Sequence, residues 1–234
     1  CEKLFESNEY RLMNKAGRYI FKGIIGLLTL SAGFISCSDD EDGYVYPPLL
    51  SEFADVVTDA SGAFTHIHTD KGENLAIVNT SELIAEGVKS DTIYRTLSRY
   101  ELVDGGGKIY SLQAIPAPYA EPLNAFPDGI KADAVEMQSI WRGGDYLNMV
   151  LLVKAQNGRH IFRFVEDSLT TSSTGVHTLH VRLYHDADGD LPAYTQKAYL
   201  SLPLSPYASR LASGDSILFS IPTSAGWQQW AREY

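Results

Sequence analysis

The sequence predicts an all-β protein that follows an export signal. Short stretches that alternate polar and apolar residues recur over residues 53–221, separated by Gly, Asn, Asp and Pro. No long segment repeats its apolar residues with the 3.6-residue period of an amphipathic helix. The signal is indicated by residues 34–42, FISCSDDED, in which one cysteine separates an apolar run from an acidic run.

The first 36 residues contain the three parts of a secretory signal. Its basic region contains Lys15, Arg18 and Lys22. Residues 23–35 are apolar and uncharged, and Ser36 is a small residue before the expected cut. The apolar run is shorter than the ~20 residues that a membrane-spanning helix needs. We therefore predict a cleaved signal over residues 1–36, with translation starting at Met13 because residues 1–12 fit no part of a signal.

Cys37 follows the apolar run and is the expected acyl acceptor of a lipoprotein. Acyl chains would anchor it, because each buried methylene group contributes roughly 0.8 kcal/mol. The alternative is a free thiol beside the cut. The residues after the cysteine favour lipidation, because they resemble the export signal of Bacteroidota lipoproteins: Ser38, Asp39, Asp40, Glu41 and Asp42. That resemblance implies transport to the outer face of the outer membrane, with residues 37–51 forming a lipidated acidic tether.

Composition limits the classes of partner and of fold. A formal net charge of −10 argues against binding of nucleic acid and against docking on an anionic membrane surface. A hydrophobic content of 44% argues against disorder. If Cys1 is removed with the signal and Cys37 carries lipid, no disulfide can form. The mature protein must then be stable through its core.

Residues 52–120 are predicted to form a first β domain. Its expected strands are 64–69, 75–78, 94–103 and 108–115. The first two are joined by the turn at 70–73, and the last two by the glycine-rich turn at 104–107. Between these hairpins, residues 81–87 are expected to form a short helical turn with Ser81 as its cap.

Four prolines within residues 116–128 mark a domain boundary, and residues 121–234 are expected to form a second β domain. Its expected strands are 135–142, 146–154, 160–165, 178–184, 198–204 and 216–221. Residues 143–145 connect the first two strands, and Asn157-Gly158 predicts a hairpin turn between the second and third. Short strands joined in this way predict a sandwich or a barrel.

An acidic segment resembles a calcium-binding loop. Asp186, Asp188 and Asp190 stand around Gly189. An EF-hand loop places Gly at position 6 and Glu at position 12. Counted from Asp186, position 4 is Gly189 and position 12 is Lys197, so the EF-hand pattern is absent. We expect an acidic hairpin turn, with weak calcium binding as the alternative and no other cofactor.

Two strands present polar residues at every second position. His180, Arg182 and Tyr184 share one strand face, which is either plain surface or a weak binding patch for a sugar or an anionic group. His66 and His68 also share a face and could supply two zinc ligands. No third ligand is near them in the sequence, so a solvated strand face is preferred.

The arrangement resembles the NigD-like family of lipoproteins. The resemblance rests on the signal with SDDED, on TDKGENL at 69–75, and on LYHDADGD at 183–190 followed by YLSLPL at 199–204. It implies an N-terminal OB-type barrel and a C-terminal β-sandwich. It also implies bacteriocin immunity, for which the family is named, and it brings no catalytic residues.

These observations lead us to expect a non-enzymatic interaction protein, lipid-anchored in the outer membrane and facing the cell exterior. The motifs Gly-x-Ser-x-Gly, Ser-x-x-Lys and His-Glu-x-x-His do not occur in the sequence. The partner is an unknown protein or glycan. One alternative is a glycan-binding accessory lipoprotein, for which Trp227 and Trp230 are candidate stacking residues unless they pack in the core. A structural subunit of an envelope complex is another.

Overall fold

The computed structural model describes residues 48–83 and 87–234. The predicted signal, Cys37 and the acidic residues 38–42 lie outside this part of the chain. Within it, no helix is long and apolar enough to cross a membrane.

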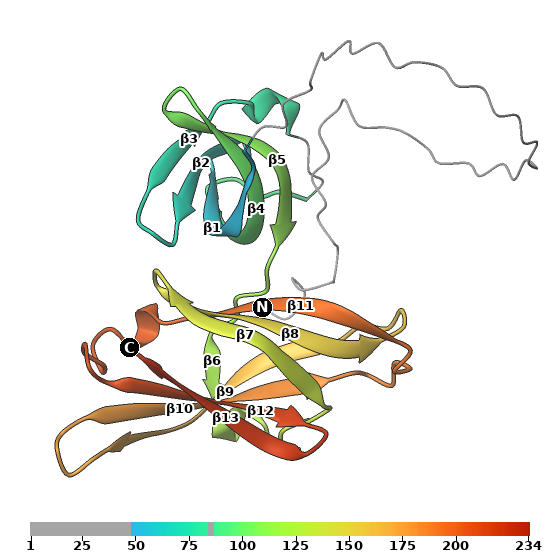
Figure 1. Ribbon diagram of the computed structural model, residues 1–234, viewed down its shortest axis with the longest axis vertical. Helices are drawn as coiled ribbons and strands as arrows, with labels where there is room; N and C mark the ends of the chain where they lie inside the picture. The colour runs from blue at the N-terminus through green and yellow to red at the C-terminus, as the bar shows by residue number, and fades with distance from the viewer. Residues whose placement is uncertain (1–47, 84–86) are drawn as a thin grey trace, which may run out of the picture.

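The described residues form thirteen β-strands and three short 3-10 helices, so the all-β prediction is confirmed. Strands β1 to β5 form a barrel and strands β6 to β13 form a sandwich. The two domains lie one above the other along the longest axis of the molecule (Figure 1).

The N-terminal domain is a closed five-stranded barrel, as expected of an OB-type domain. Its strands are β1 (Leu50–Thr58), β2 (Phe64–Thr69), β3 (Asn74–Ile77), β4 (Ile93–Val103) and β5 (Gly106–Ala114). The barrel order is β1-β2-β3-β5-β4, and β1 pairs antiparallel with both β2 and β4. The predicted hairpins β2–β3 and β4–β5 are confirmed. β1 begins at Leu50, inside the segment expected to be tether.

The barrel closes where β3 and β5 run parallel. A Cβ atom on Gly106 would lie 2.7 Å from the carbonyl oxygen of Ala76, and one on Gly107 would lie 2.9 Å from Ile67 Cδ1. Such contacts are too short for real side chains, so the glycines allow this close approach. The barrel core contains Ala54, Val56, Phe64, Ile67, Ile77, Tyr100, Ile109 and Leu112.

The short helical turn was predicted over residues 81–87 with Ser81 as its cap, and residues 84–86 lie outside the described part of the chain. A 3-10 helix spans Thr80–Glu82, so Ser81 lies inside the turn. Asn79 precedes the helix, and its buried side chain satisfies both backbone groups of Ile109 through hydrogen bonds of 2.9 Å. The propensity of serine for helix caps did not decide the boundary, because Asn79 and Thr80 are fixed by bonds to neighbouring strands.

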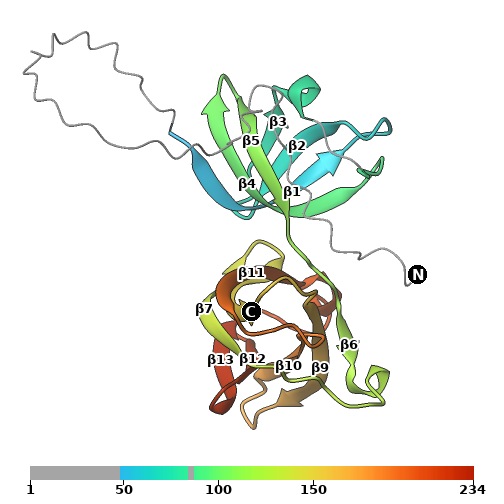
Figure 2. The same cartoon turned by 90° about the vertical axis from the view of Figure 1, so that its right-hand side faces the viewer.

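The C-terminal domain is a β-sandwich. Its strands are β6 (Ala120–Pro122), β7 (Val135–Gly143), β8 (Tyr146–Ala155), β9 (Ile161–Thr171), β10 (His177–Asp186), β11 (Tyr194–Pro203), β12 (Ser216–Thr223) and β13 (Gly226–Glu233). One sheet has the order β13-β12-β10-β9-β6 and the other β11-β8-β7. Figure 2 shows β7 and β11 on the side of the barrel, with β9 and β10 on the far side. Leucine, valine and phenylalanine side chains fill the space between the sheets, among them Leu151, Phe164, Leu179, Val181 and Phe219.

Two connections that were expected to be hairpin turns instead cross between the sheets. β8 pairs with β7 and β11, whereas β9 pairs with β10 and β6, so the hairpin predicted at Asn157-Gly158 is wrong. The hairpin predicted for the acidic segment is also wrong, because β10 pairs with β9 and β12 while β11 pairs with β8. Asn-Gly and Asp-Gly favour a tight turn, but they do not determine which strands pair.

Candidate functional site

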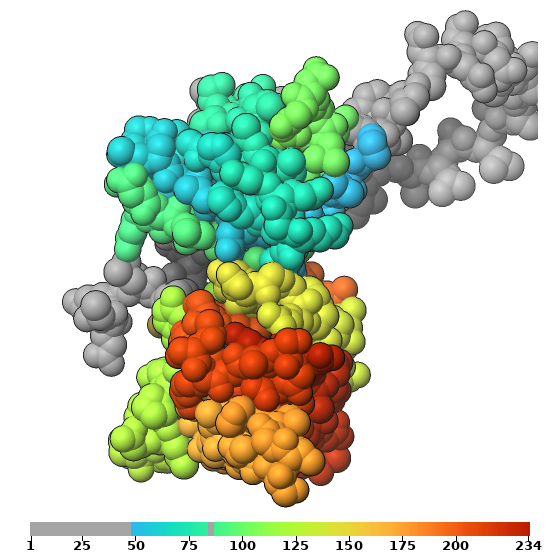
Figure 3. All heavy atoms as spheres, turned by 90° about the vertical axis from the view of Figure 1, so that its left-hand side faces the viewer, coloured from blue at the N-terminus to red at the C-terminus, as the bar shows by residue number. Residues whose placement is uncertain are grey.

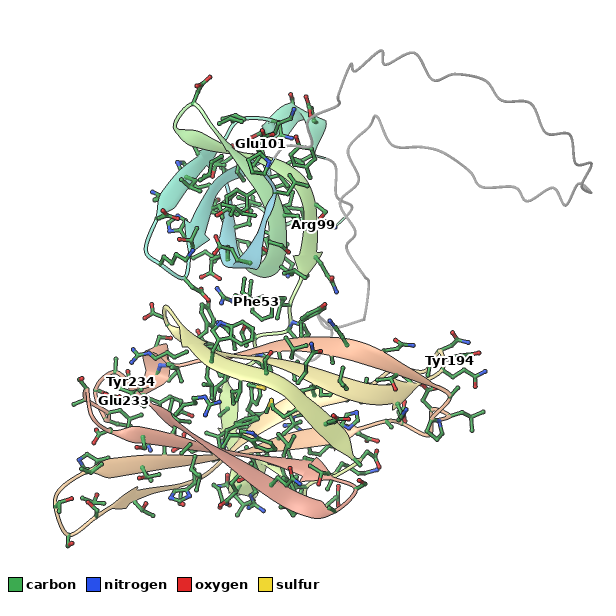
Figure 4. All side chains as sticks on the ribbon, in the orientation of Figure 1. Phe53, Arg99, Glu101, Tyr194, Glu233 and Tyr234 are labelled. Atoms are coloured by element: carbon green, nitrogen blue, oxygen red, sulfur yellow. The ribbon has the colours of Figure 1, made fainter. Side chains whose placement is uncertain are left out.

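The barrel and the three-stranded sheet of the sandwich are joined by a small apolar cluster. Phe53, Ile115 and Val150 are buried in it. The ring of Phe53 lies 5.1 Å from that of Trp141 and 5.9 Å from that of Tyr199, between centroids. Figure 4 shows Phe53 between the two domains. Burial of these side chains stabilises one arrangement of the domains.

Arg95 of β4 lies beside this cluster and connects the domains through polar contacts. Its side chain is only 3% exposed. The guanidinium makes five contacts: Nε donates to Ser201 Oγ (3.2 Å), Nη1 to Asp55 Oδ1 (3.2 Å) and Asp70 Oδ1 (2.7 Å), and Nη2 to Asp70 Oδ2 (2.7 Å) and Asn148 Oδ1 (2.9 Å). The paired bonds to Asp70 are the bidentate geometry that makes arginine–carboxylate pairs strong.

Residues of the three-stranded sheet of the sandwich complete the network. Asn148 Nδ2 donates to Asp70 Oδ2 at 2.8 Å, and Ser201 Oγ donates to Asn148 Oδ1 at 2.7 Å. The ring of Tyr146 lies 4.0 Å from the guanidinium carbon of Arg95, and its hydroxyl donates to Asp55 Oδ2 at 3.1 Å. Every member therefore has a partner, as a buried polar network requires.

The network holds one cation between two carboxylates. Burial raises the pKa of Asp55, although Arg95 and the Tyr146 hydroxyl act to lower it. Burial and the nearby Asp55 also raise the pKa of Tyr146, so its hydroxyl stays a donor at neutral pH. With both carboxylates ionised, the junction has an excess negative charge.

A cleft of about 440 Å³ opens beside the network, between the β2–β3 hairpin and the β7–β8 turn. Its lining residues are Asp55, His68, Thr69, Asp70, Lys71, Gly72, Glu73, Asn74, Gly144, Asp145 and Tyr146. Figure 3 shows this side of the molecule, with the barrel seated on the yellow segment of the sandwich. The volume is within the range of ligand-binding clefts.

The cleft has a negative lining. It contains four carboxylates, those of Asp55, Asp70, Glu73 and Asp145. The ammonium group of Lys71 lies 3.7 Å from Glu52, which lies outside the cleft lining. Such a lining favours a cationic group of a partner and disfavours an anionic one.

Sequence reasoning did not select this site. Asp70 belongs to the TDKGENL stretch and Ser201 to YLSLPL, but Arg95 and Asn148 each resemble an ordinary polar residue of a strand. Arg95 is separated in the chain from Asn148 by 53 residues and from Ser201 by 106 residues, so only the fold brings these side chains together.

The three carboxylates proposed as a weak calcium site do not converge. Asp186 accepts a hydrogen bond from the backbone of Asp188 and lies 3.5 Å from Lys131. Asp190 instead accepts a hydrogen bond from the backbone N–H of Gln156. This bond, with those from the backbone of Asn157 and Gly158, holds the pKa of the Asp190 carboxyl at about 2. The described residues contain no group of three or more His, Cys, Asp or Glu that could hold a metal ion.

The three residues proposed as a ligand patch do share the outer face of β10. His180 hydrogen-bonds to Thr170 at 3.0 Å. Arg182 pairs with Asp167, and its guanidinium carbon lies 6.0 Å from the ring of Trp227. The ring of Tyr184 lies 5.5 Å from that of Phe126. The alternation predicted their common face, and their binding role stays a prediction.

The remaining candidates are two histidines in the barrel and two tryptophans in the sandwich. His66 and His68 are exposed on one face of β2, with ring centroids 6.4 Å apart, and His68 lines the cleft. Trp230 packs against the sandwich core, whereas Trp227 is 44% exposed. Trp230 therefore has the core role, and the stacking role of Trp227 stays a prediction.

The fold and the junction define a two-domain β protein in which a small barrel is fixed to a sandwich. Residues 118–232 match the family described as the NigD-like C-terminal beta sandwich domain. The crystal structure of a NigD-like immunity protein from Bacteroides caccae is 35% identical, with a TM-score of 0.64, and the match covers 82% of this chain and 94% of that one. The chain belongs to the NigD-like family.

Two further solved structures share the fold. A candidate toxin-related protein from Parabacteroides distasonis is 16% identical with a TM-score of 0.63, covering 80% of this chain and 93% of that one. A candidate lipoprotein from Bacteroides fragilis is 14% identical with a TM-score of 0.54, covering 80% and 97%. No curated protein matches the chain.

Proposed function

We propose that this protein is an immunity protein that protects its host by binding a protein toxin, without catalysis. The observation that carries the proposal is the 35% identity to a NigD-like immunity protein over 94% of that chain. The likeness extends over both domains, so it includes the junction as well as the sandwich.

The geometry of the junction supports a binding role. Arg95 and the apolar cluster hold the β2–β3 hairpin against the β7–β8 turn, so both walls of the cleft are positioned before a partner arrives. Preorganised surfaces lose less conformational entropy on binding. The carboxylates of Glu73 and Asp145 would receive lysine or arginine side chains of the toxin.

We also propose that the protein acts from a lipid anchor at Cys37, on the outer face of the outer membrane. The FISCSDDED segment supports this location, as does the fold shared with a candidate lipoprotein. Metabolic labelling with an alkyne palmitate analogue should mark the native chain and not Cys37→Ala. Absence of label on the native chain would reject the anchor but not the binding activity.

The immunity proposal is tested by deleting the gene and challenging the strain with toxins from sibling strains. Deletion should raise sensitivity, and the native gene should restore protection. The double variant Glu73→Lys/Asp145→Lys should restore it less well, because it reverses the charge of the cleft. Asp128→Lys, an exposed change in the sandwich, is the matched control. Unchanged sensitivity of the deletion strain to every toxin would reject immunity.

Glycan binding is a second candidate, favoured by the outer face of β10. Trp227 of β13 is exposed beside this face, and the guanidinium carbon of Arg182 lies 6.0 Å from its ring centroid. Exposed tryptophan rings stack well on sugars. A glycan array probed with the native chain and with Trp227→Ala separates the two functions, since a signal lost in the variant would assign the face to a glycan.

A further inference from the structure

Two histidines form a buried chain of hydrogen bonds beside the two connections that cross between the sheets of the sandwich. His160 lies in the connection from β8 to β9, and His185 lies near the end of β10. Their side chains are well shielded, since His160 is 8% exposed and His185 is buried. The ring of Phe162 stacks on that of His185 at 4.6 Å, with the planes 3° apart.

The chain of contacts has three links. His185 Nδ1 lies 2.8 Å from the carbonyl oxygen of Asp133. His185 Nε2 lies 2.8 Å from His160 Nδ1. His160 Nε2 lies 3.3 Å from Asp190 Oδ2. The links therefore connect the segment before β7, the end of β10 and both connections that cross between the sheets.

Counting protons fixes the charge of this chain. A carbonyl oxygen only accepts, so His185 Nδ1 must carry a hydrogen. If His185 is neutral, its Nε2 has a lone pair and accepts from His160 Nδ1–H. A carboxylate also only accepts, so His160 Nε2 must carry a hydrogen as well. Three links need three protons, whereas two neutral imidazoles supply two.

The surroundings favour His160 over His185 as the ring that carries the third proton. Backbone N–H groups of Gln156 and Asn157 bond to both oxygens of Asp190, which holds the pKa of that carboxyl at about 2 and keeps it ionised. Burial lowers the pKa of His185, so His185 is the neutral ring.

Other charged groups stand around the pair. The Asp133 carboxylate accepts from the backbone N–H of Ala187, and the Asp186 carboxylate lies 3.5 Å from Lys131. Asp188 and Arg159 are on the adjoining connections, where Arg159 is exposed. The two carboxylates nearest His185 favour positive charge on the pair and oppose the effect of burial.

We propose that His160 is an imidazolium at neutral pH and that its proton fastens the two inter-sheet connections to each other, which makes this end of the sandwich pH-sensitive. Loss of one proton as the pH rises leaves two protons for three links, so His160 loses either its bond to His185 or its contact with Asp190, and the shielded carboxylate no longer has a cation beside it. Gain of a fourth proton as the pH falls removes the lone pair of His185 Nε2 and breaks the bond between the rings. The connections are thus held most firmly between these two changes.

The imidazole nitrogens report this state directly. In the full chain labelled with ¹⁵N, two-bond correlation spectra at pH 7 should show His160 protonated at both nitrogens and His185 protonated at Nδ1 alone. A neutral His160 at pH 7, or a proton on His185 Nε2, would overturn the proposal. The measurement uses the native chain, so it does not depend on the folding of any variant.

Variants test the mechanical consequence. Raising the pH should increase hydrogen exchange at Gln156 and Asn157 by more than the tenfold per pH unit expected from base catalysis. His160→Gln, which cannot become charged, should lose that excess, while His66→Gln on exposed β2 should retain it. An excess that persists in His160→Gln would also contradict the proposal.

Discussion

Replacing Arg95 with methionine should destabilise the protein strongly. The substitution keeps the apolar stem beside Phe53 but removes all five contacts of the guanidinium. Asp70 and Asp55 would then remain largely buried with no counter-charge. Removing one member of a buried ion pair costs about 3–5 kcal/mol. The two carboxylates retain side-chain exposures of 17% and 22%, so water moderates the cost to the lower end, about 3 kcal/mol.

Urea unfolding at pH 7 measures this loss. Trp141 is partly buried at the junction, so tryptophan fluorescence should report the transition. A loss of about 3 kcal/mol corresponds to a change on the order of 100-fold in the unfolding equilibrium. Arg99→Met is the matched control, because Arg99 lies on the same strand but is exposed (Figure 4).

A double variant also removes the negative charge of Asp70, which Arg95 neutralises in the native chain. Arg95→Met/Asp70→Asn should be less destabilised than the sum of the single changes, because one uncompensated carboxylate is gone. The reasoning would be refuted if Arg95→Met lost under about 1 kcal/mol, or no more than Arg99→Met, since contacts in a buried network cannot be that weak.

Three further changes probe the junction and the barrel. Asp55→Asn should be at least as stable as the native chain at pH 7 and should lose this advantage at pH 4. The reason is that the pKa of Asp55 is raised in the folded state, so ionisation of Asp55 destabilises the fold as the pH rises. A variant that loses more unfolding free energy at pH 7 than at pH 4 would contradict this. Gly143→Ala should lower the unfolding free energy by about 1–3 kcal/mol, because its Cβ would lie 2.3 Å from a carboxylate oxygen of Asp70, which Arg95 and Asn148 hold in place. An unchanged urea midpoint would show that Asp70 can move aside without cost. Asn79→Ala should cost about 2–4 kcal/mol by leaving two buried backbone groups of Ile109 unpaired, with Thr65→Ala, at a half-buried position of β2, as the comparison expected to lose less.

Local signals in the sequence predicted much of the fold. The hairpins β4–β5 and β7–β8 are joined by short glycine-containing turns, so pairing and turn are close in the chain and were both predicted. The alternation around His180, Arg182 and Tyr184 likewise predicted a solvent-facing strand surface. These features depend on periods and turns that a short stretch of residues determines.

Features that depend on distant partners were missed. Asn157-Gly158 gave a strong hairpin signal, yet β8 already has a partner on each side, and nothing near the turn indicates this. A polar residue within a strand pattern also suggests a solvent-facing position. The burial of Arg95 depends on residues from distant parts of the chain, among them Asn148 and Ser201 of the sandwich, which lie 53 and 106 residues away.

The place of β1 in the barrel has a mechanical consequence. This strand pairs with β4 from Leu50 to Val57 on one side and with β2 from Ala54 to Thr58 on the other. Because antiparallel ladder bonds lie perpendicular to the strands, a pull along β1 from the Leu50 end loads both rows together in shear and does not open them one after another. Tension applied at the Leu50 end therefore loads the barrel in shear, which resists extension more than opening the bonds one by one does.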